Sequence, residues 1–146
     1  MNKFDEYYMK KALILSKKAN EKNEVPVGAV LVFNNKIIAK GYNSSIIKND
    51  PTAHAEIIVL RKGGYFFKNY RLLNTTLYVT LQPCLMCLGA VLNSRIYKLV
   101  YGANSNYYNN YNIFNFFIKK NIKIKNNIFK SKCESIIKNF FNNKRK

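Results

Sequence analysis

The sequence predicts a protein of the α/β class, because segments with helical spacing alternate along the chain with short apolar segments typical of strands. The first helical segment precedes two apolar segments that are joined by the turn residues Asn34-Asn35. Two further helical segments follow, and each is succeeded by another strand-like segment. This alternation indicates a sheet that is covered by helices.

The first predicted element is an amphipathic helix over residues 4–19. Its apolar side chains recur at intervals of three or four residues, which is the spacing of one helix face. Asp5 and Glu6 suit its start, because the N-terminal end of the helix dipole is positive. The predicted apolar face comprises Phe4, Tyr8, Ala12, Leu15 and Ala19.

A hairpin and a second helix are predicted next. Residues 25–33 have the composition of a buried strand, and residues 36–42 form its partner after the turn. The second helix should begin near Asp50-Pro51-Thr52, because Asp can cap a helix and Pro is tolerated in its first turn, and it should end at Gly63-Gly64. The remaining predictions are a strand over 77–81, a helix over 83–92 that Pro83 begins, and a strand over 96–101.

The C-terminal part of the chain has a different composition. Residues 104–127 are of low complexity, with nine Asn in 24 residues, and within them residues 122–125 alternate like an edge strand. The sequence Ser131-Lys132-Cys133-Glu134 has the form of a capping box, which predicts a last helix, and helical spacing places Cys133 in its core face. We expect residues 142–146 to form a solvated basic tail.

Length and composition indicate one domain over residues 1–146, since a chain of 17.0 kDa is large enough to bury a single core. No apolar run approaches the roughly 20 residues of a membrane span, and Asp5 and Glu6 stand where a signal peptide would be apolar. We therefore expect a cytoplasmic protein with no membrane contact. Three cysteines do not make a disulfide framework, and Cys-x-x-Cys in a reducing compartment is more typical of a metal or redox site.

The chain has a formal charge of +18, from 25 Lys and Arg against 7 Asp and Glu. Such a surface attracts polyanions, which favours a nucleic acid over a small neutral molecule as the partner. Bias toward A/T-rich codons is the alternative explanation, because it enriches Lys and Asn. This bias explains the choice of Lys over Arg better than it explains the absence of acids between Ile57 and Cys133.

Three residues form a candidate metal site. His54, the only histidine, begins the sequence His54-Ala55-Glu56, and Pro83-Cys84-Leu85-Met86-Cys87 starts 27 residues after Glu56. One imidazole and two thiolates leave the fourth position of a tetrahedral zinc ion for water, and zinc lowers the pKa of bound water from about 15.7 to about 7. Glu56 is placed to move protons to and from that water. The pattern therefore predicts a hydrolytic zinc site.

Cys-x-x-Cys also occurs in thioredoxin-type dithiols and in structural zinc sites with four ligands. A dithiol enzyme gives no role to the His-x-Glu cluster. A closed zinc site needs a fourth ligand, and the chain offers only Cys133, which is distant in sequence. The open catalytic site is therefore the favoured interpretation.

His54-Ala55-Glu56 followed by Pro83-Cys84-x-x-Cys87 resembles the signature of zinc-dependent nucleobase deaminases. Over residues 4–103 the chain resembles in particular the bacterial tRNA-specific adenosine deaminases. The resemblance implies a cytidine-deaminase-like fold, with helices on both faces of a five-stranded mixed sheet. It also implies a homodimer, one Zn²⁺ per subunit, and conversion of adenosine to inosine at wobble position 34 of an arginine tRNA. The other matching stretches are Glu24-Val25-Pro26-Val27-Gly28-Ala29-Val30, Asp50-Pro51-Thr52-Ala53 and Asn69-Tyr70-Arg71-Leu72.

Further site residues follow from this resemblance. Asn43, which by its local sequence is either a turn residue or a base contact, matches the family's substrate-contacting asparagine. Val27, Gly28 and Ala29 match the strand against which the base packs. Gln82 stands where the family usually has Glu before Pro-Cys, which removes a charge near the metal, and we expect a modest effect.

The predicted function is hydrolytic deamination of adenosine in a tRNA anticodon loop, with His54, Cys84 and Cys87 as zinc ligands and Glu56 as the proton shuttle. One alternative is a deaminase of a free nucleobase or nucleotide, such as cytosine, guanine or deoxycytidylate, which can use the same zinc cluster but has no use for a basic surface. The other alternative is a non-catalytic RNA-binding protein that keeps zinc for folding only. A steep salt dependence of binding distinguishes a tRNA substrate from a free base, and binding of zinc and RNA without formation of inosine would favour the non-catalytic protein.

Overall fold

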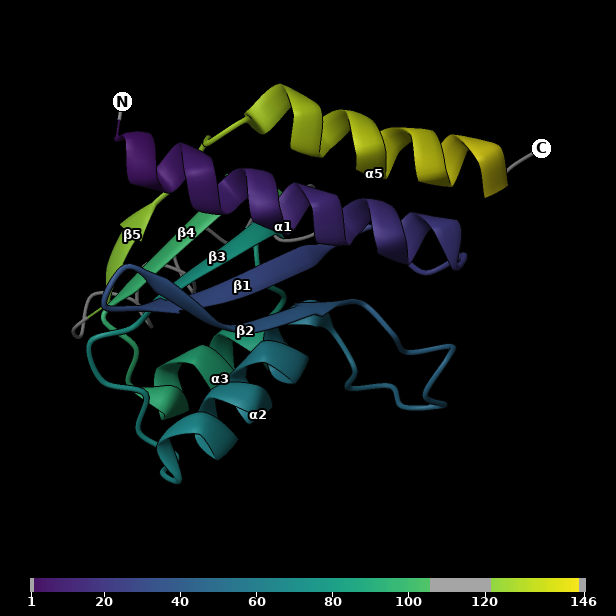
Figure 1. Ribbon diagram of the computed structural model, residues 1–146. Coiled ribbons are helices and arrows are strands. Elements are labelled where there is room, and N and C mark those ends of the chain that lie inside the picture. Colours follow the sequence, from purple (N-terminus) through teal and green to yellow (C-terminus); the bar gives the residue numbers. More distant parts are fainter. Residues whose placement is uncertain (1, 106–121, 145–146) are drawn as a thin grey trace.

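The chain folds into a sheet between two layers of helices, as the computed structural model shows for residues 2–105 and 122–144 (Figure 1). The elements are α1 (Lys3–Glu21), β1 (Gly28–Phe33), β2 (Lys36–Tyr42), α2 (Ala55–Phe67), β3 (Thr76–Leu81), α3 (Leu85–Ser94), β4 (Lys98–Ala103), β5 (Lys123–Lys125) and α5 (Lys130–Lys144). The strand order is β2-β1-β3-β4-β5. Helices α1 and α5 cover one face of the sheet, and α2 and α3 cover the other (Figure 1).

The sheet is mixed. Strand β1 is antiparallel to both β2 and β3, whereas β3, β4 and β5 run parallel to one another. Helix α3 connects β3 to β4, because parallel neighbours need a crossover connection. The predicted α/β class is confirmed, and so is the five-stranded mixed sheet with helices on both faces.

The β1–β2 hairpin has the turn that its sequence predicts. Asn34 and Asn35 both have positive φ, 49° and 60°, as a two-residue turn between twisted strands requires. Strand β2 has the predicted bounds, but β1 begins at Gly28 and not at Val25. The residues before it are turned, because the N–H of Val27 donates to the carbonyl of Val25 at 2.8 Å.

Strand β1 alternates between two parts of the core. Ala29 and Leu31 pack with the layer of α2 and α3, whereas Val30 and Val32 pack with α1. Gly28 lies where β1 passes close to α1, and a Cβ at this position would overlap the carbonyl oxygen of Ala12. A residue without a side chain is therefore required for α1 to lie this close to the sheet.

Helix α1 buries four of the five residues of its predicted apolar face. The prediction is wrong for Phe4, which is 57% exposed. Asp5 lies at the buried position instead, with 1% of its surface exposed. The apolar spacing could not show this, because the partners of Asp5 lie far away in the sequence.

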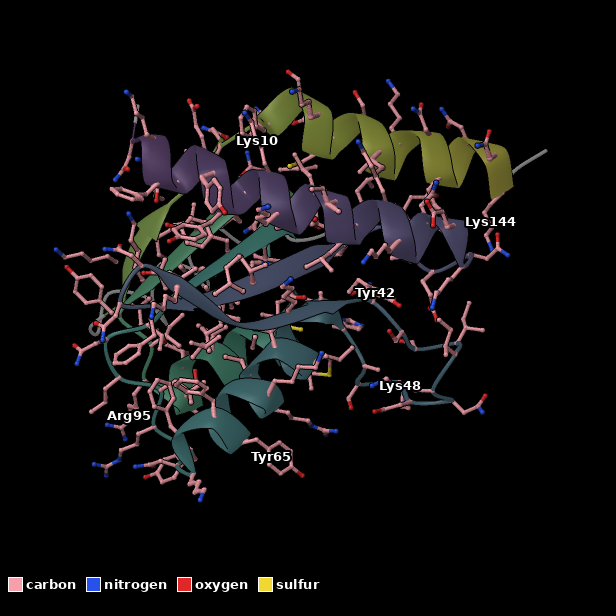
Figure 2. All side chains as sticks on the ribbon, viewed as in Figure 1. Lys10, Tyr42, Lys48, Tyr65, Arg95 and Lys144 are labelled. Carbon is pink, nitrogen blue, oxygen red and sulfur yellow. The ribbon has the colours of Figure 1, made fainter. Side chains whose placement is uncertain are left out.

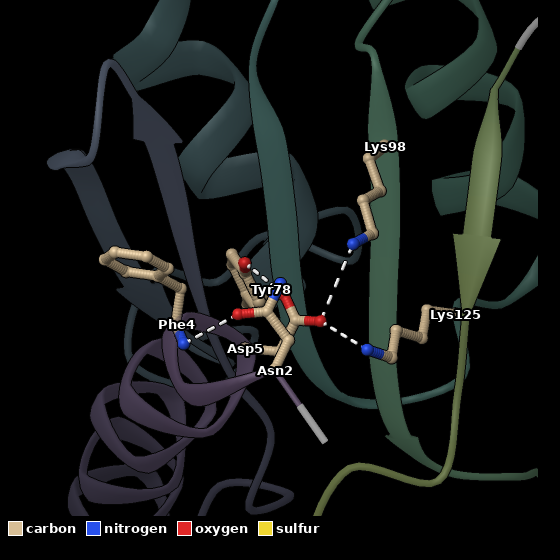
Figure 3. A network of polar contacts seen from close by, with 6 residues as sticks. All are labelled: Asn2, Phe4, Asp5, Tyr78, Lys98 and Lys125. Atoms are coloured by element: carbon tan, nitrogen blue, oxygen red, sulfur yellow. Dashed lines mark hydrogen bonds and ion pairs between the residues drawn. The ribbon is translucent and has the colours of Figure 1, made fainter.

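Asp5 anchors the start of α1 to three strands (Figure 3). Its Oδ1 accepts a hydrogen bond of 2.7 Å from the hydroxyl of Tyr78 in β3. Its Oδ2 lies 2.7 Å from Nζ of Lys125 in β5 and 3.6 Å from Nζ of Lys98 in β4. Burial by itself raises the pKa of this carboxyl, but the hydrogen bonds from Lys125 and Tyr78 and the charge of Lys98 outweigh burial. The pKa of Asp5 therefore lies below its ordinary value.

Replacing Asp5 by asparagine should lower the free energy of unfolding by about 1–3 kcal/mol, since two lysines lose the charge that they face. Because the pKa is lower in the folded state than the ordinary 3.8, the contribution of Asp5 is present above that value and is lost as the pH falls through the folded pKa. Urea unfolding of both proteins from about pH 7 to about pH 2 should show their difference shrinking below about pH 4. A constant difference over that range would contradict this role.

Helices α2 and α3 begin later than predicted. Asp50 does not cap α2, because its Oδ1 accepts from both the N–H and the hydroxyl of Thr52 and closes a turn instead. Helix α2 begins at Ala55, directly after His54, and α3 begins directly after Cys84. His54 and Cys84 are therefore the N-cap residues, with extended backbone, and do not lie in the first turns.

The predicted end of α2 is also wrong. The helix continues through Gly63-Gly64 and ends at Phe67, before the C-cap residue Lys68, which adopts a left-handed conformation with φ of 52°. Gly63 serves packing and not termination, because a Cβ there would meet the side chains of Leu31 and Leu72. Glycine within a helix can thus mark a close contact with a sheet.

The capping-box prediction for the last helix is wrong. Helix α5 already begins at Lys130, with the N–H of Cys133 donating to the carbonyl of Phe129 at 3.0 Å, so Ser131 lies inside the helix. Oε1 of Glu134 lies 3.8 Å from Nζ of Lys130, so this side chain pairs with a lysine and does not cap the helix. Cys133 is fully buried, which confirms that it is a core residue.

Strand β5 confirms the predicted edge strand, since it pairs with β4 only. The low-complexity residues 106–121 and the end of the predicted basic tail, residues 145–146, lie outside the described residues. In the described parts of the chain, no helix combines the length and the apolar character that crossing a bilayer requires.

Basic side chains surround the molecule. Figure 2 shows Lys10 on α1, Lys48 on the loop after β2, Arg95 after α3 and Lys144 on α5, on different sides of the protein. The positive charge is therefore not gathered on one face, and it does not by itself identify a binding surface.

Candidate active site

Two of the predicted site residues lie at the start of α2. His54 is the N-cap residue and makes no capping hydrogen bond with its side chain, so its imidazole is available to a ligand. Glu56 lies in the first turn and is only 4% exposed. Asn43 holds this helix start in place, because its Oδ1 accepts a hydrogen bond of 2.8 Å from the N–H of Ala55.

The two cysteines lie where β3 leads into α3. Cys84 is the N-cap residue of α3, and Cys87 lies in the first turn. Cys84 is partly exposed, Cys87 is fully buried, and both are free thiols. Because α2 and α3 pack side by side on one face of the sheet, their starts bring the cysteines to His54.

The three side chains are spaced as metal ligands. Nδ1 of His54 lies 3.6 Å from Sγ of Cys84 and 3.5 Å from Sγ of Cys87. A tetrahedral zinc ion, with bonds of about 2.0–2.1 Å to nitrogen and about 2.3 Å to sulfur, separates such ligand atoms by about 3.6 Å. The His/Cys/Cys group therefore fits an ion of this kind. Within residues 2–105 and 122–144, no fourth protein ligand belongs to the group.

The three groups alter one another's protonation. A hydrogen bond from Cys87 and the neighbouring His54 lower the pKa of the Cys84 thiol to about 4. The same hydrogen bond raises the pKa of Cys87, and a hydrogen bond with Cys84 raises the pKa of His54. Cys84 is therefore a thiolate at neutral pH, which is the form of cysteine that binds metals.

Glu56 lies beside this group without belonging to it. Burial raises the pKa of its carboxyl to about 7, and the Cys84 thiolate acts in the same direction. A carboxyl group with such a pKa can both accept and donate a proton at neutral pH.

The residues matched to substrate contacts lie in β1 or next to the ends of β1 and β2. The N–H of Asn43, just after β2, donates to the carbonyl of Val27 at 3.1 Å. The bond from Ala55 occupies Oδ1 of Asn43, which leaves Nδ2 to donate to a ligand. Val27 and Ala29 belong to the core on the side of α2 and α3, whereas Gly28 faces α1. A contact from Gly28 to a ligand would therefore come from its backbone.

Gln82 links the end of β3 to the chain that follows β4. Its Oε1 accepts a hydrogen bond of 3.0 Å from the N–H of Ser105, and its backbone N–H donates to the carbonyl of Ala103 at 2.8 Å. A carboxylate could accept the same bond from Ser105. Gln82 therefore makes a contact that a carboxylate could also make, without placing a negative charge before Pro83-Cys84.

Comparison with known proteins identifies the family. The MafB19-like deaminase family matches residues 2–145. The tRNA-specific adenosine deaminase of Buchnera aphidicola subsp. Baizongia pistaciae is 54% identical, over 100% of this chain and 93% of that protein. The chain belongs to the tRNA-specific adenosine deaminases. This deaminase is therefore a hydrolytic enzyme, which the His/Cys/Cys group and Glu56 already suggested.

Solved structures agree with the family. One structure, from work on A-to-I editing by tRNA:A34 deaminases at the wobble position of transfer RNA, has a TM-score of 0.82 and 35% identity, covering 89% of this chain and 98% of the other. Guanine deaminase of Bacillus subtilis has a TM-score of 0.66 and 39% identity, covering 71% of this chain and 66% of the other. The first match confirms the cytidine-deaminase-like fold that the sequence resemblance implied.

Proposed function

We propose that this deaminase converts adenosine to inosine at wobble position 34 of a tRNA anticodon loop, and that its substrate is an arginine tRNA. The main support is the pairing of a His/Cys/Cys group with the buried Glu56 in a chain that is 54% identical to a tRNA-specific adenosine deaminase. The formal charge of +18 also favours an RNA substrate, because a positively charged protein attracts the phosphates of RNA.

We further propose that His54, Cys84 and Cys87 hold one Zn²⁺ in each subunit. Their nitrogen–sulfur separations of 3.5 and 3.6 Å and their donor types support this metal. When bound, zinc would supply an activated water molecule as the nucleophile at neutral pH. The backbone at the start of α3 contributes as well, because N-terminal N–H groups favour thiolates over thiols.

The proposed role of Glu56 is proton transfer. Its carboxylate would take a proton from the attacking water, donate it to N1 of adenine, and then assist the departure of ammonia. Water and adenosine thus give inosine and ammonia. Nδ2 of Asn43 would donate to the base or the ribose, and Val27 and Ala29 would supply the apolar surface on which the base packs, with Gly28 contributing only its backbone.

We also propose a cytoplasmic homodimer in which residues 1–146 form a single domain. Leu85 and Met86 support a subunit contact, since both lie in the first turn of α3 and are 51% and 38% exposed. Apolar side chains at such exposure are typical of surfaces that a partner covers.

Anticodon stem-loops of an arginine tRNA test the substrate. We expect zinc-loaded protein to convert adenosine at position 34 to inosine, as read by sequencing or mass spectrometry of the RNA. A stem-loop with cytidine at position 34 and one with adenosine moved to position 35 serve as matched controls, and we expect neither to react. Conversion of cytidine alone, or binding of RNA and zinc with no inosine, would overturn the proposal.

Free guanine is the second candidate substrate, because guanine deaminase of Bacillus subtilis is 39% identical over 71% of this chain. Ammonia release from free guanine, cytosine and adenosine should be measured with the same protein preparation. A rate on a free base that exceeds the rate on the stem-loop would favour this alternative.

A further inference from the structure

We propose that Glu24 is a positioning residue for RNA, which holds the loop between β2 and α2, residues 43–54, against the body of the protein. Glu24 itself is not expected to touch the substrate. The inference rests on the proposed RNA deaminase function, because it assigns this loop to the recognition of an anticodon loop.

Glu24 is a buried acid that binds backbone groups. Only 2% of the surface of Glu24 is exposed. Its Oε1 accepts from the N–H of Ile46 at 3.1 Å, and its Oε2 accepts from the N–H of Ile47 at 2.8 Å. The ion pairs of the described residues involve Asp5 and Glu134 and not Glu24, although the chain is rich in lysine. The carboxylate of Glu24 therefore binds the backbone of the loop.

The segment around Glu24 is fixed to the body of the protein. The N–H of Glu24 donates to the carbonyl of Ala19 at the end of α1, at 2.9 Å. The carbonyl of Val27, three residues later, accepts from the N–H of Asn43 at 3.1 Å. Residues 24–27 thus contact the loop at two points, one through a side chain and one through the backbone.

The base of the loop lies against the candidate active site. The loop leaves the sheet at the end of β2 and returns at the start of α2 (Figure 1). The N–H of Ser44 donates to the carbonyl of Ala53 at 2.9 Å, and Asn43 accepts from the N–H of Ala55. Both ends of the loop are therefore joined next to His54.

The middle of the loop presents side chains to solvent. Ile46 and Ile47 are 64% and 50% exposed, although their N–H groups are held by the buried Glu24. Lys48 follows them and extends into solvent on the same loop (Figure 2). Unpaired RNA offers bases for apolar contact and phosphates for a cation, whereas a free nucleobase has no phosphate for Lys48. Glu24 thus determines where an RNA-binding tip is held.

Glu24→Gln tests this role, because an amide has one acceptor oxygen and cannot satisfy both N–H groups. We expect KM for the anticodon stem-loop to rise about tenfold while kcat changes less than about twofold, since losing one hydrogen bond to a charged group shifts the loop toward released conformations. Hydrogen exchange at the amides of Ile46 and Ile47 should accelerate about tenfold for the same reason.

Asp5→Asn is the matched control, because it also removes a buried acid and lowers stability, at a place where Asp5 contacts β3, β4 and β5 and not the loop. We expect it to leave KM and the exchange of Ile46 and Ile47 unchanged. Zinc content should be equal in all variants. If both variants change KM equally, Glu24 acts through stability alone and the inference is overturned.

The double variant Ile46→Ala/Ile47→Ala keeps the backbone donors and Glu24, so it tests the loop tip even if Glu24→Gln does not fold. We expect it to raise KM for the stem-loop with little change in kcat. Faster exchange in Glu24→Gln without any change in KM would also overturn the role in RNA positioning. If wild-type protein converts no stem-loop, the proposed function is wrong, while the exchange measurement still decides whether Glu24 holds the loop.

Discussion

Replacing Glu56 by glutamine is expected to reduce deamination of the stem-loop by at least about 10²–10⁴-fold, the range of a general acid–base catalyst, while the protein stays folded and keeps its metal. The carboxyl group is buried beside the ligand group, and burial raises its pKa to about 7. An amide has the same shape but cannot take up and return a proton. The loss should therefore appear in kcat, with little change in the binding of RNA.

Single-turnover rates of inosine formation measure this effect, and metal analysis and thermal unfolding show that the site is intact. Glu134→Gln is the matched control, because Glu134 lies on the surface of α5 with its side chain 48% exposed. We expect the control to react at the wild-type rate. A Glu56→Gln protein that retains zinc and more than about a tenth of the wild-type rate would show that another group moves the protons.

Replacing Cys87 by alanine is expected to remove metal binding and activity together. The two remaining side chains, His54 and Cys84, are too few to hold zinc in a site of three protein ligands. Removing a residue that hydrogen-bonds to a metal ligand already lowers metal affinity by about 10–100-fold. Removing a ligand itself should therefore lower metal affinity by at least about 100-fold. The thermal midpoint should fall as well, because a metal that binds only the folded state stabilises it.

Cys133→Ala provides the control for the chemistry of cysteine. Cys133 is also fully buried, but it lies in α5 and contacts Gly102, away from the ligand group. We expect this variant to keep one zinc per subunit and wild-type activity, with a loss of stability of about 1 kcal/mol. Metal analysis and activity are measured for both variants. Equal zinc content and activity in Cys87→Ala and wild type would show that the metal site has been assigned wrongly.

Much of the secondary structure could be predicted, because its causes lie within a few residues. The turn at Asn34-Asn35 follows from the tolerance of asparagine for positive φ, and the apolar spacing after Tyr8 defines the buried face of α1. Helix α2 begins later than its local sequence predicts, because the Asp50 side chain bonds to Thr52 within a turn that composition does not reveal.

The role of the acidic residues shows where local patterns stop being informative. Three of the seven acids, Asp5, Glu24 and Glu56, are buried. Only Glu56 lies in a motif, whereas Asp5 bonds to residues 73 and 120 positions away and Glu24 to residues 22 and 23 positions away. Composition does not distinguish these three acids from the other four of the chain, because only the fold brings their partners to them.

The sequence by itself determined the kinds of metal-binding atoms, their spacing within each motif, and the alternation that gives an α/β fold, because these depend on neighbouring residues. The tertiary structure decided that His54 meets Cys84 and Cys87 from 30 and 33 residues away, that Glu56 has a raised pKa, and that Glu24 holds the loop beside them. The metal ligands meet only when α2 and α3 pack on the same face of the sheet, and the pKa of Glu56 and the bonds of Glu24 likewise depend on burial and on contacts between distant residues.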